Sequence, residues 1–258
     1  MIRKVLQPFY TAFVFITFLV CILVAFPFFL LIGSRDHPTS REAIWHIVHY
    51  WAIGWLAVIG MPVRKLGVKP DNKKYVVIAN HISYMDTVAI YAALPCYFRT
   101  LAKKEMARIP IFGFIYKQLT ILVDRSSAEN RTKSMRLMWR ALRNESNIAI
   151  FPEGTFNETE APLKNFYDGA FKLAISSQTP VLPVLFLDTV NRWHYNAWWK
   201  LWPGKNRVLY LPPVSVEGMG MADLPALKQR LHELMATELR KYGYPYVYEM
   251  PKIARQSS

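Results

Sequence analysis

The stretch YVVIANHISYMD occupies residues 75–86 and joins two different patterns. Its first five residues are apolar and rich in β-branched side chains, which is typical of a buried strand. From Asp86 to Leu94 the pattern is that of a helix, and Pro95 ends it. The sequence therefore predicts a strand-to-helix junction, with the polar segment 80–86 at the carboxyl end of the strand.

The same alternation of strand and helix continues toward the C-terminus. It predicts further strands at residues 98–102, 121–123, 147–151, 181–187 and 207–211. It also predicts a short helix after Pro110 and longer ones at residues 127–143, 169–176 and 224–242. Such alternation indicates an α/β fold with a mainly parallel sheet flanked by helices.

The N-terminal sixty residues have a different character. No charged residue occurs from Val5 to Ser34, and the run is longer than the roughly 20 apolar residues that span a bilayer. It lacks the short apolar core and small-residue cleavage site of a signal peptide. A second uncharged stretch, residues 43–63, carries three Trp and two His residues, which suits the lipid headgroup interface.

These two segments leave several arrangements open. They either span the membrane out and back, or form a hairpin in one leaflet with Pro27 near its turn. For the second segment, a buried core helix is a further alternative. We divide the chain into membrane-anchoring helical segments, residues 1–63, and a domain at 64–258 on the cytoplasmic side. Removal of residues 1–62 is then expected to weaken membrane binding but to leave the site around His81 and Glu153 formed.

The composition narrows the class of protein. With 52% hydrophobic residues the chain is not disordered, and its two cysteines supply neither a disulfide framework nor a cysteine-rich metal site. The net charge is +14, of which +12 falls after residue 63, because residues 1–63 hold four basic and two acidic side chains. A basic domain beside a membrane favours anionic headgroups, phosphorylated substrates or an acidic carrier protein. Nucleic-acid signature motifs are missing, so we expect no nucleic-acid partner.

Polar residues follow three of the predicted strands, where sites form in such sheets. His81 and Asp86 follow the first, and a carboxylate there can orient an imidazole that takes a proton; the alternative is a helix N-cap beside a loop histidine. Glu153, Gly154 and Thr155 follow another strand and either meet a ligand or form an ordinary turn. Arg125 follows a third and either forks onto a phosphate or pairs with its acidic neighbour. No further His or Cys cluster accompanies these residues, so we expect no metal site.

Together these blocks resemble the glycerolipid acyltransferase family, whose best-known members are lysophosphatidate acyltransferases. Its Asn-His-x-x-x-x-Asp motif is matched by Asn80, His81 and Asp86, and its Phe-Pro-Glu-Gly-Thr motif by residues 151–155. Ile121 and Arg125 match a further block, as do Val181, Pro183 and Val184. Order and spacing agree over roughly residues 75–190.

The resemblance implies roles for these residues. His81 would be the general base and Asp86 its orienting partner, while Asn80, Lys103, Arg125, Glu153, Gly154 and Thr155 would bind substrate. The implied enzyme is a membrane-bound 1-acylglycerol-3-phosphate acyltransferase that makes phosphatidic acid in phospholipid biosynthesis. It would need no cofactor, with acyl-CoA or acyl carrier protein supplying the thioester co-substrate. Its expected partners are the lipid bilayer and a lysolipid acceptor, with acyl carrier protein left open.

Two positions depart from the family pattern. The glycine of the Arg125 block is Leu119 here, and the arginine that usually follows Glu-Gly-Thr is Phe156. The family's arginine is thought to help hold the acceptor's phosphate. Its replacement keeps an alternative acceptor open, namely a lysophospholipid with a headgroup or a lyso-aminolipid.

Overall fold

The computed structural model describes residues 2–34, 37–109, 111–123 and 127–244. Seven strands form one sheet in the order β1-β7-β6-β2-β5-β3-β4. Their bounds are β1 Val63–Gly67, β2 Val76–Ala79, β3 Phe98–Lys103, β4 Thr120–Val123, β5 Asn147–Ile150, β6 Val181–Phe186 and β7 Asn206–Tyr210. All neighbouring pairs are parallel except β6 with β7, which confirms the predicted mainly parallel sheet.

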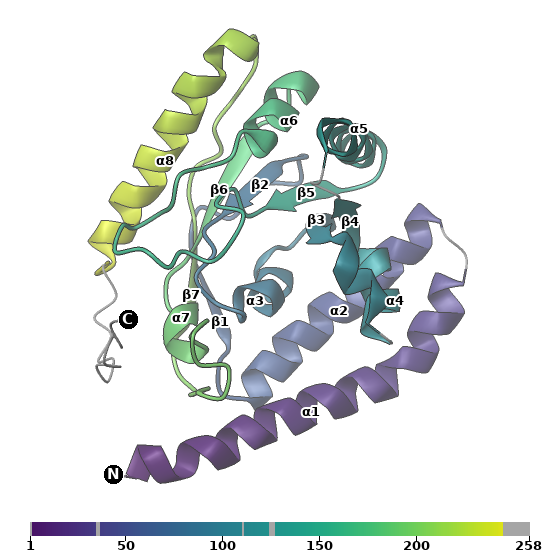
Figure 1. Cartoon of the computed structure of the whole chain (residues 1–258), viewed down its shortest axis with the longest axis vertical. Helices are drawn as coiled ribbons and strands as arrows, with labels where there is room; N and C mark the ends of the chain where they lie inside the picture. The colour runs from purple at the N-terminus through teal and green to yellow at the C-terminus, as the bar shows by residue number, and fades with distance from the viewer. Residues whose placement is uncertain (1, 35–36, 110, 124–126, 245–258) are drawn as a thin grey trace, which may run out of the picture.

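Helices cover both faces of the sheet (Figure 1). One face carries α5 (Ala128–Asn144), α6 (Gly169–Ser177) and α8 (Leu224–Lys241). The other carries α2 (Pro38–Val58), α3 (Asp86–Ala93) and α4 (Phe112–Leu119). Three further helices among the described residues are short: Lys104–Arg108, α7 (Thr189–Arg192) and Met221–Asp223. Because both faces are buried, strands such as β2 are apolar at every position and not only at alternate ones.

The sequence patterns did not indicate the first strand. β1 forms the edge of the sheet beside β7, and Arg64 and Lys65 lie exposed in its middle. Charged side chains are common on edge strands, where they discourage pairing with another chain. They also remove the apolar run or regular alternation by which a strand is recognised in a sequence.

The second N-terminal segment packs into the core of the α/β domain. In α2, Trp45, Leu56 and their inward neighbours are buried and join the same hydrophobic cluster as β2 and β6. Tyr50, Ile53 and Val58 point outward. Residues 43–58 thus form a core helix of the domain with one exposed apolar side. The prediction that this segment lies at the lipid headgroup interface applies to that side alone. The predicted boundary between residues 63 and 64 falls within β1 and remains a prediction.

Helix α1 (Ile2–Gly33) runs along the outside of the domain, beneath α2 and α3 in the view of Figure 1. It is continuous, so Pro27 lies inside a helix and not at a hairpin turn; α1 ends at Gly33 and α2 begins at Pro38. Among the described residues, α1 is the one helix long and apolar enough to cross a membrane.

The protein-facing side of α1 contacts the domain along the whole helix. Near its start, Thr11 Oγ1 donates to the carbonyl of Trp199 over 2.8 Å. At its middle, the Phe18 ring packs edge-on against Trp51 and Trp55. At its end, the Gly33 carbonyl accepts a bond from Gln118. The opposite side exposes a continuous set of apolar residues: Ile2, Val5, Phe9, Phe13, Ile16, Val20, Leu23, Val24 and Leu31.

Candidate active site

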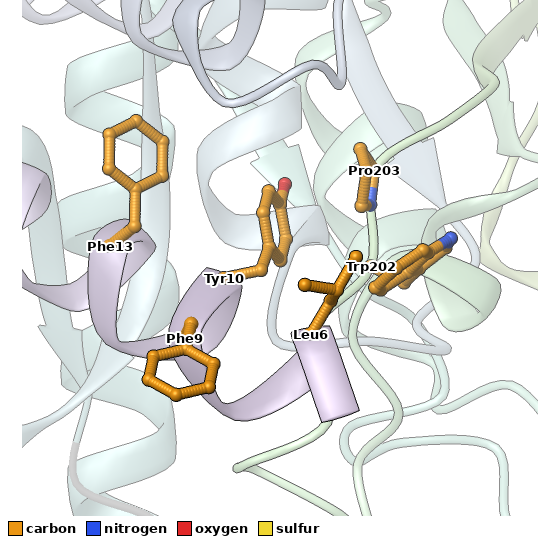
Figure 2. Close-up of a pocket in the computed structure, with 6 residues that line it drawn as sticks. All are labelled: Leu6, Phe9, Tyr10, Phe13, Trp202 and Pro203. Atoms are coloured by element: carbon orange, nitrogen blue, oxygen red, sulfur yellow. The ribbon is translucent and has the colours of Figure 1, made fainter. Parts of the chain in front are cut away.

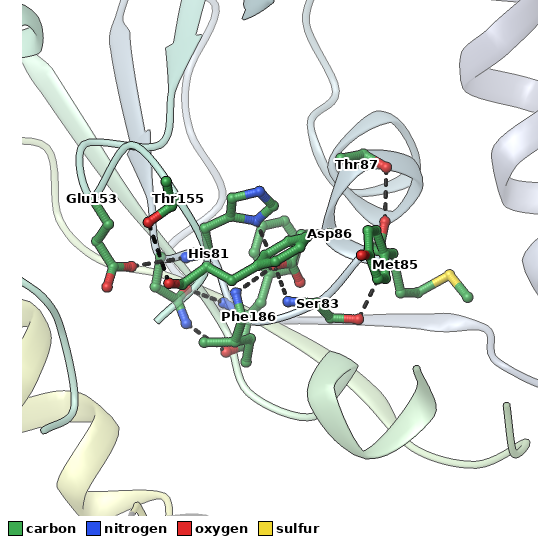
Figure 3. A network of polar contacts seen from close by, with 12 residues as sticks. His81, Ser83, Met85, Asp86, Thr87, Glu153, Thr155 and Phe186 are labelled. Atoms are coloured by element: carbon green, nitrogen blue, oxygen red, sulfur yellow. Dashed lines mark hydrogen bonds and ion pairs between the residues drawn. The ribbon is translucent and has the colours of Figure 1, made fainter. Parts of the chain in front are cut away.

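The loop after β2 brings His81 and Asp86 together, as their spacing predicts. Asp86 is the first residue of α3 and is fully buried. Its Oδ2 lies 3.0 Å from His81 Nδ1 and accepts bonds from the backbone N–H groups of Ile82 at 2.7 Å and Ser83 at 2.8 Å (Figure 3). The two backbone donors fix the carboxylate, and a carboxylate beside Nδ1 favours the tautomer that leaves Nε2 free to accept a proton.

Aromatic rings enclose the imidazole of His81. Phe151 stacks on it with centroids 4.2 Å apart at 20°, and the Phe156 ring lies 4.3 Å away at 57°. Only 15% of the His81 side chain is exposed. Tyr84 packs edge-on against Phe156, and Tyr195 stacks on its far side. The base therefore sits in an apolar setting, with the nitrogen opposite Asp86 pointing away from the polar network (Figure 3).

Glu153 links the two predicted blocks through the backbone. Its Oε1 accepts the N–H of His81 at 2.9 Å, and its Oε2 accepts the N–H of Lys164 at 2.8 Å. The side chain is 2% exposed. Burial raises the pKa of Glu153 to about 7, although both backbone donors favour the charged form. Both oxygens thus accept backbone N–H groups, and Glu153 holds the loop of His81 in place. Its contact with substrate remains a prediction.

Two other polar residues of the first block also have internal partners. The Asn80 amide bridges to β6, donating to the Phe186 carbonyl at 3.0 Å and accepting from the Phe186 N–H at 2.7 Å. It is fully buried and ties β2 to β6, and its predicted contact with substrate remains a prediction. Ser83 is likewise buried; its hydroxyl donates to the Trp193 carbonyl at 2.5 Å and accepts from the N–H of Met85.

The remaining candidates fall into two groups. Gly154, at φ +75°, and Thr155 form the exposed turn after β5, on the Glu153 side of the site. The positive φ explains the glycine, since other residues rarely adopt it. Arg125 and the side chain of Lys103 lie outside the described residues, so their predicted contacts with substrate remain predictions.

The structure adds residues that the sequence analysis did not connect with the site. Lys164, eleven positions beyond Glu153, bonds to Thr155 of the turn after β5. From the segment after α7, Trp193 contacts Tyr84 and Tyr195 stacks on Phe156. No local spacing predicts these contacts, because they depend on how separate loops pack. Within the described residues, no group of three His, Cys, Asp or Glu side chains could hold a metal ion, and the absence of a metal cofactor remains a prediction.

The geometry can now be compared with known proteins. A family model described as Acyltransferase matches residues 61–187, which include the His81–Asp86 loop and the Glu153 turn. A 1-acyl-sn-glycerol-3-phosphate acyltransferase from Haemophilus influenzae is 30% identical over 230 residues, covering 86% of this chain and 91% of that protein. The chain belongs to the acyltransferase family. The resemblance inferred from the short motifs is therefore confirmed.

The chain is also similar to other acyltransferases in sequence and in fold. The sheep 1-acyl-sn-glycerol-3-phosphate acyltransferase alpha is 29% identical over 191 residues, covering 73% of this chain and 66% of its own length. The crystal structure of the 1-acyl-sn-glycerophosphate acyltransferase PlsC from Thermotoga maritima has a TM-score of 0.75 at 21% identity. It covers 95% of this chain and 100% of the PlsC chain, so the shared acyltransferase fold includes the N-terminal helices.

Proposed function

We propose that this acyltransferase moves a fatty acyl group from a thioester to the free hydroxyl of 1-acylglycerol-3-phosphate, giving phosphatidic acid. The observation that carries the proposal is the buried pairing of His81 with Asp86 at the end of β2. The chain's similarity to 1-acyl-sn-glycerol-3-phosphate acyltransferases supports the acceptor. The donor is the thioester of coenzyme A or of acyl carrier protein, and no cofactor takes part.

The chemistry follows from the free nitrogen of His81. An alcohol is a weak nucleophile until a base removes its proton, and such help contributes about 10²–10⁴-fold. As His81 Nε2 takes the proton, the acceptor oxygen bonds to the thioester carbonyl carbon and forms a tetrahedral intermediate. The carbon–sulfur bond then breaks, and the departing sulfur takes the proton from the imidazolium. The Asp86 carboxylate, 3.0 Å from Nδ1, stabilises that imidazolium.

A direct transfer fits the surroundings of the base. Ser83 is the hydroxyl nearest to His81 in sequence, but it is fully buried and donates to the Trp193 carbonyl. It is therefore not placed to attack a substrate. The hydroxyl of the acceptor takes the nucleophile's position, and no acyl-enzyme is required.

The arrangement of α1 supports a membrane-embedded enzyme, and we propose that its α/β domain lies on the cytoplasmic side. Since α1 contacts the domain at its start, middle and end, its axis lies along the domain surface and its apolar side faces outward. A helix held in this way lies in one leaflet. Trp198 and Trp199 are exposed beside it, as expected for side chains at the headgroup level.

An apolar groove lies on the lipid-facing part of this arrangement. It measures about 370 Å³ and is lined by Leu6, Phe9, Tyr10, Phe13, Trp202 and Pro203 (Figure 2). The side chains come from the first turns of α1 and from the segment that reaches the active site through Trp193. In the membrane, lipid chains would fill this groove and bring the bilayer close to the catalytic loop.

The test is an acceptor panel. Purified protein is incubated with labelled acyl-CoA or acyl carrier protein thioester and each of several lysolipids, and the products are identified by mass spectrometry. We expect phosphatidic acid from 1-acylglycerol-3-phosphate. Absence of that product, with acylation of another lysolipid, would overturn the acceptor and leave the transfer chemistry standing.

The second candidate is the same transfer to a lysophospholipid with a headgroup or to a lyso-aminolipid. Phe156 favours it, because its ring packs on His81 and Tyr84 where the family usually has an arginine. With a lyso-aminolipid, Phe156→Arg should damage activity. With 1-acylglycerol-3-phosphate, the same substitution should improve activity or leave it unchanged, so measuring it on both acceptors separates the candidates.

A further inference from the structure

Phe156 stands where the family usually has an arginine, so the positive charge that would bind an acceptor phosphate is missing at this position. The Phe156 ring is occupied in the aromatic packing around His81, with Tyr84 on one side and Tyr195 on the other. It offers no donor to an anion. A terminal phosphate needs charge-assisted hydrogen bonds, which are roughly twice as strong as neutral ones. If the acceptor carries a phosphate, a cation at a position other than residue 156 must supply them.

Lys164 places a cation at this turn. Its Nζ donates to the Thr155 hydroxyl at 2.8 Å and lies 3.5 Å from the carbonyl oxygen of Phe156. The ammonium is thus bound to the backbone of the very residue that replaces the arginine. It is partly buried, so its position is more restricted than that of a fully exposed lysine.

The backbone of Lys164 is held in a fixed position relative to His81. Its N–H donates to Glu153 Oε2, while Glu153 Oε1 accepts the N–H of His81. One buried carboxylate therefore holds the catalytic loop and the lysine backbone in a constant relation. A phosphate bound by the ammonium would lie on the Thr155 side of the base, so the acceptor's hydroxyl and its phosphate are recognised by two linked loops (Figure 3 shows Glu153, Thr155 and His81).

The ammonium keeps the capacity to bind an anion. It has three donor hydrogens, and its two partners among the described residues are neutral oxygens, Thr155 Oγ1 and the Phe156 carbonyl. Among the described residues, no carboxylate forms an ion pair with it; the Glu153 oxygens are taken by backbone N–H groups. A phosphate oxygen can therefore join or displace these weak neutral partners without breaking an ion pair.

We propose that Lys164 binds the phosphate of the lysolipid acceptor and takes over the role of the arginine that Phe156 replaces. This inference deepens the proposed function and rests on it. It makes Lys164 a specificity-determining residue, because it would favour acceptors with a phosphate over the same lipid without one. Arg125, outside the described residues, remains a separate candidate for that phosphate.

The test compares Lys164→Met and Lys164→Arg in the full-length protein. We expect Lys164→Met to raise KM for 1-acylglycerol-3-phosphate about ten- to a hundredfold, the range of a charge-assisted contact, with little change in kcat. Lys164→Arg should restore most of the loss, since arginine keeps the charge. Monoacylglycerol, which lacks the phosphate, should compete with an unchanged inhibition constant in all variants. Lys172→Met is the matched control, because Lys172 lies exposed on α6.

The outcomes separate the inference from the proposed function. An unchanged KM in Lys164→Met overturns the inference, as does an equal weakening of monoacylglycerol binding or no rescue by arginine, which would show a structural role. If the wild-type enzyme does not acylate 1-acylglycerol-3-phosphate, the proposed function fails. The inference is then decided by the binding of that lipid to His81→Ala and to His81→Ala with Lys164→Met. Equal affinities would overturn it, and weaker binding by the double variant would support it.

Discussion

His81 and Asp86 are the residues on which the proposed chemistry most directly depends. His81→Ala should abolish transfer, because the base is lost while the backbone bonds of the loop remain. Asp86→Asn should be severe as well, since an amide holds the imidazole in the wrong tautomer, an effect worth about 10⁴-fold in a serine protease. Turnover of purified variants measures both, with membrane fractionation as the control for folding. Near-wild-type turnover of His81→Ala would refute the mechanism.

The raised pKa of Glu153 should make the free energy of unfolding depend on pH. Burial raises its pKa to about 7 in the folded protein, from 4.5. The folded state therefore binds this proton more tightly than the unfolded state does. The resulting contribution to the free energy of unfolding is fully present below pH 4.5 and is lost as the pH rises to about 7. At about 1.4 kcal/mol per pH unit, the loss is roughly 2–3 kcal/mol between pH 5 and 7.

Glu153→Gln should remove that part of the slope, because glutamine does not titrate. It should also lower turnover, since an amide cannot accept both backbone N–H groups that the carboxylate accepts. Unfolding free energies measured at pH 5 and 7.5 test the slope, with the exposed Glu158→Gln as control. Equal slopes for wild type and Glu153→Gln would show that other groups carry the pH dependence.

At the scale of elements, the segment after α7 connects α1 to the catalytic loop. Phe15 of α1 packs edge-on against Trp193, with ring centroids 5.6 Å apart. The Trp193 ring contacts Tyr84, and its carbonyl accepts a hydrogen bond from the Ser83 hydroxyl. A change in α1 should therefore reach the loop that carries His81 through these packed aromatic rings.

Phe15→Ala is expected to lower kcat/KM by up to about tenfold, since an aromatic pair contributes roughly 0.5–1.5 kcal/mol beyond its buried area. Membrane binding should persist, because the outward side of α1 is unchanged. Phe28→Ala removes a similar ring from the exposed side of the same helix and serves as control. If both variants keep full activity, α1 anchors the enzyme without positioning its loop.

At the scale of the whole molecule, the apolar outer side of α1 should hold the protein in the bilayer. We expect it to sediment with membranes and to resist extraction by high salt and by alkaline carbonate, because insertion and not charge retains it. A quantitative blot of both fractions provides the measurement. Release by salt alone would show that the basic surface of the domain is the main attachment.

The packing of α2 bears on the prediction that the site forms without residues 1–62. That truncation would delete the buried Trp45, Leu56 and their neighbours. Each such side chain contributes about 1.5–3 kcal/mol, and a domain has only about 5–15 kcal/mol in total. We expect the truncated chain to be unfolded or aggregated by circular dichroism. A folded, active product would show that the domain closes without α2.

Local sequence determined much of this protein. Short apolar runs located β2 to β7, and the polar segments after them located His81, Asp86 and the Glu153 turn, because strand ends meet at one edge of a parallel sheet. The long uncharged run located α1. These features depend on near neighbours in the chain, where periodicity and composition carry the information.

The tertiary structure alone decided how the remaining residues act. Asn80 bonds to Phe186 across 106 positions and ties β2 to β6, while Glu153 bonds to His81 across 72 positions and supports its loop. Lys164 reaches the turn at Phe156, and α2 joins the core, through contacts that no local spacing records. The physical reason is that a buried polar group or apolar face must find a partner, and which partner it finds depends on the packing of distant segments.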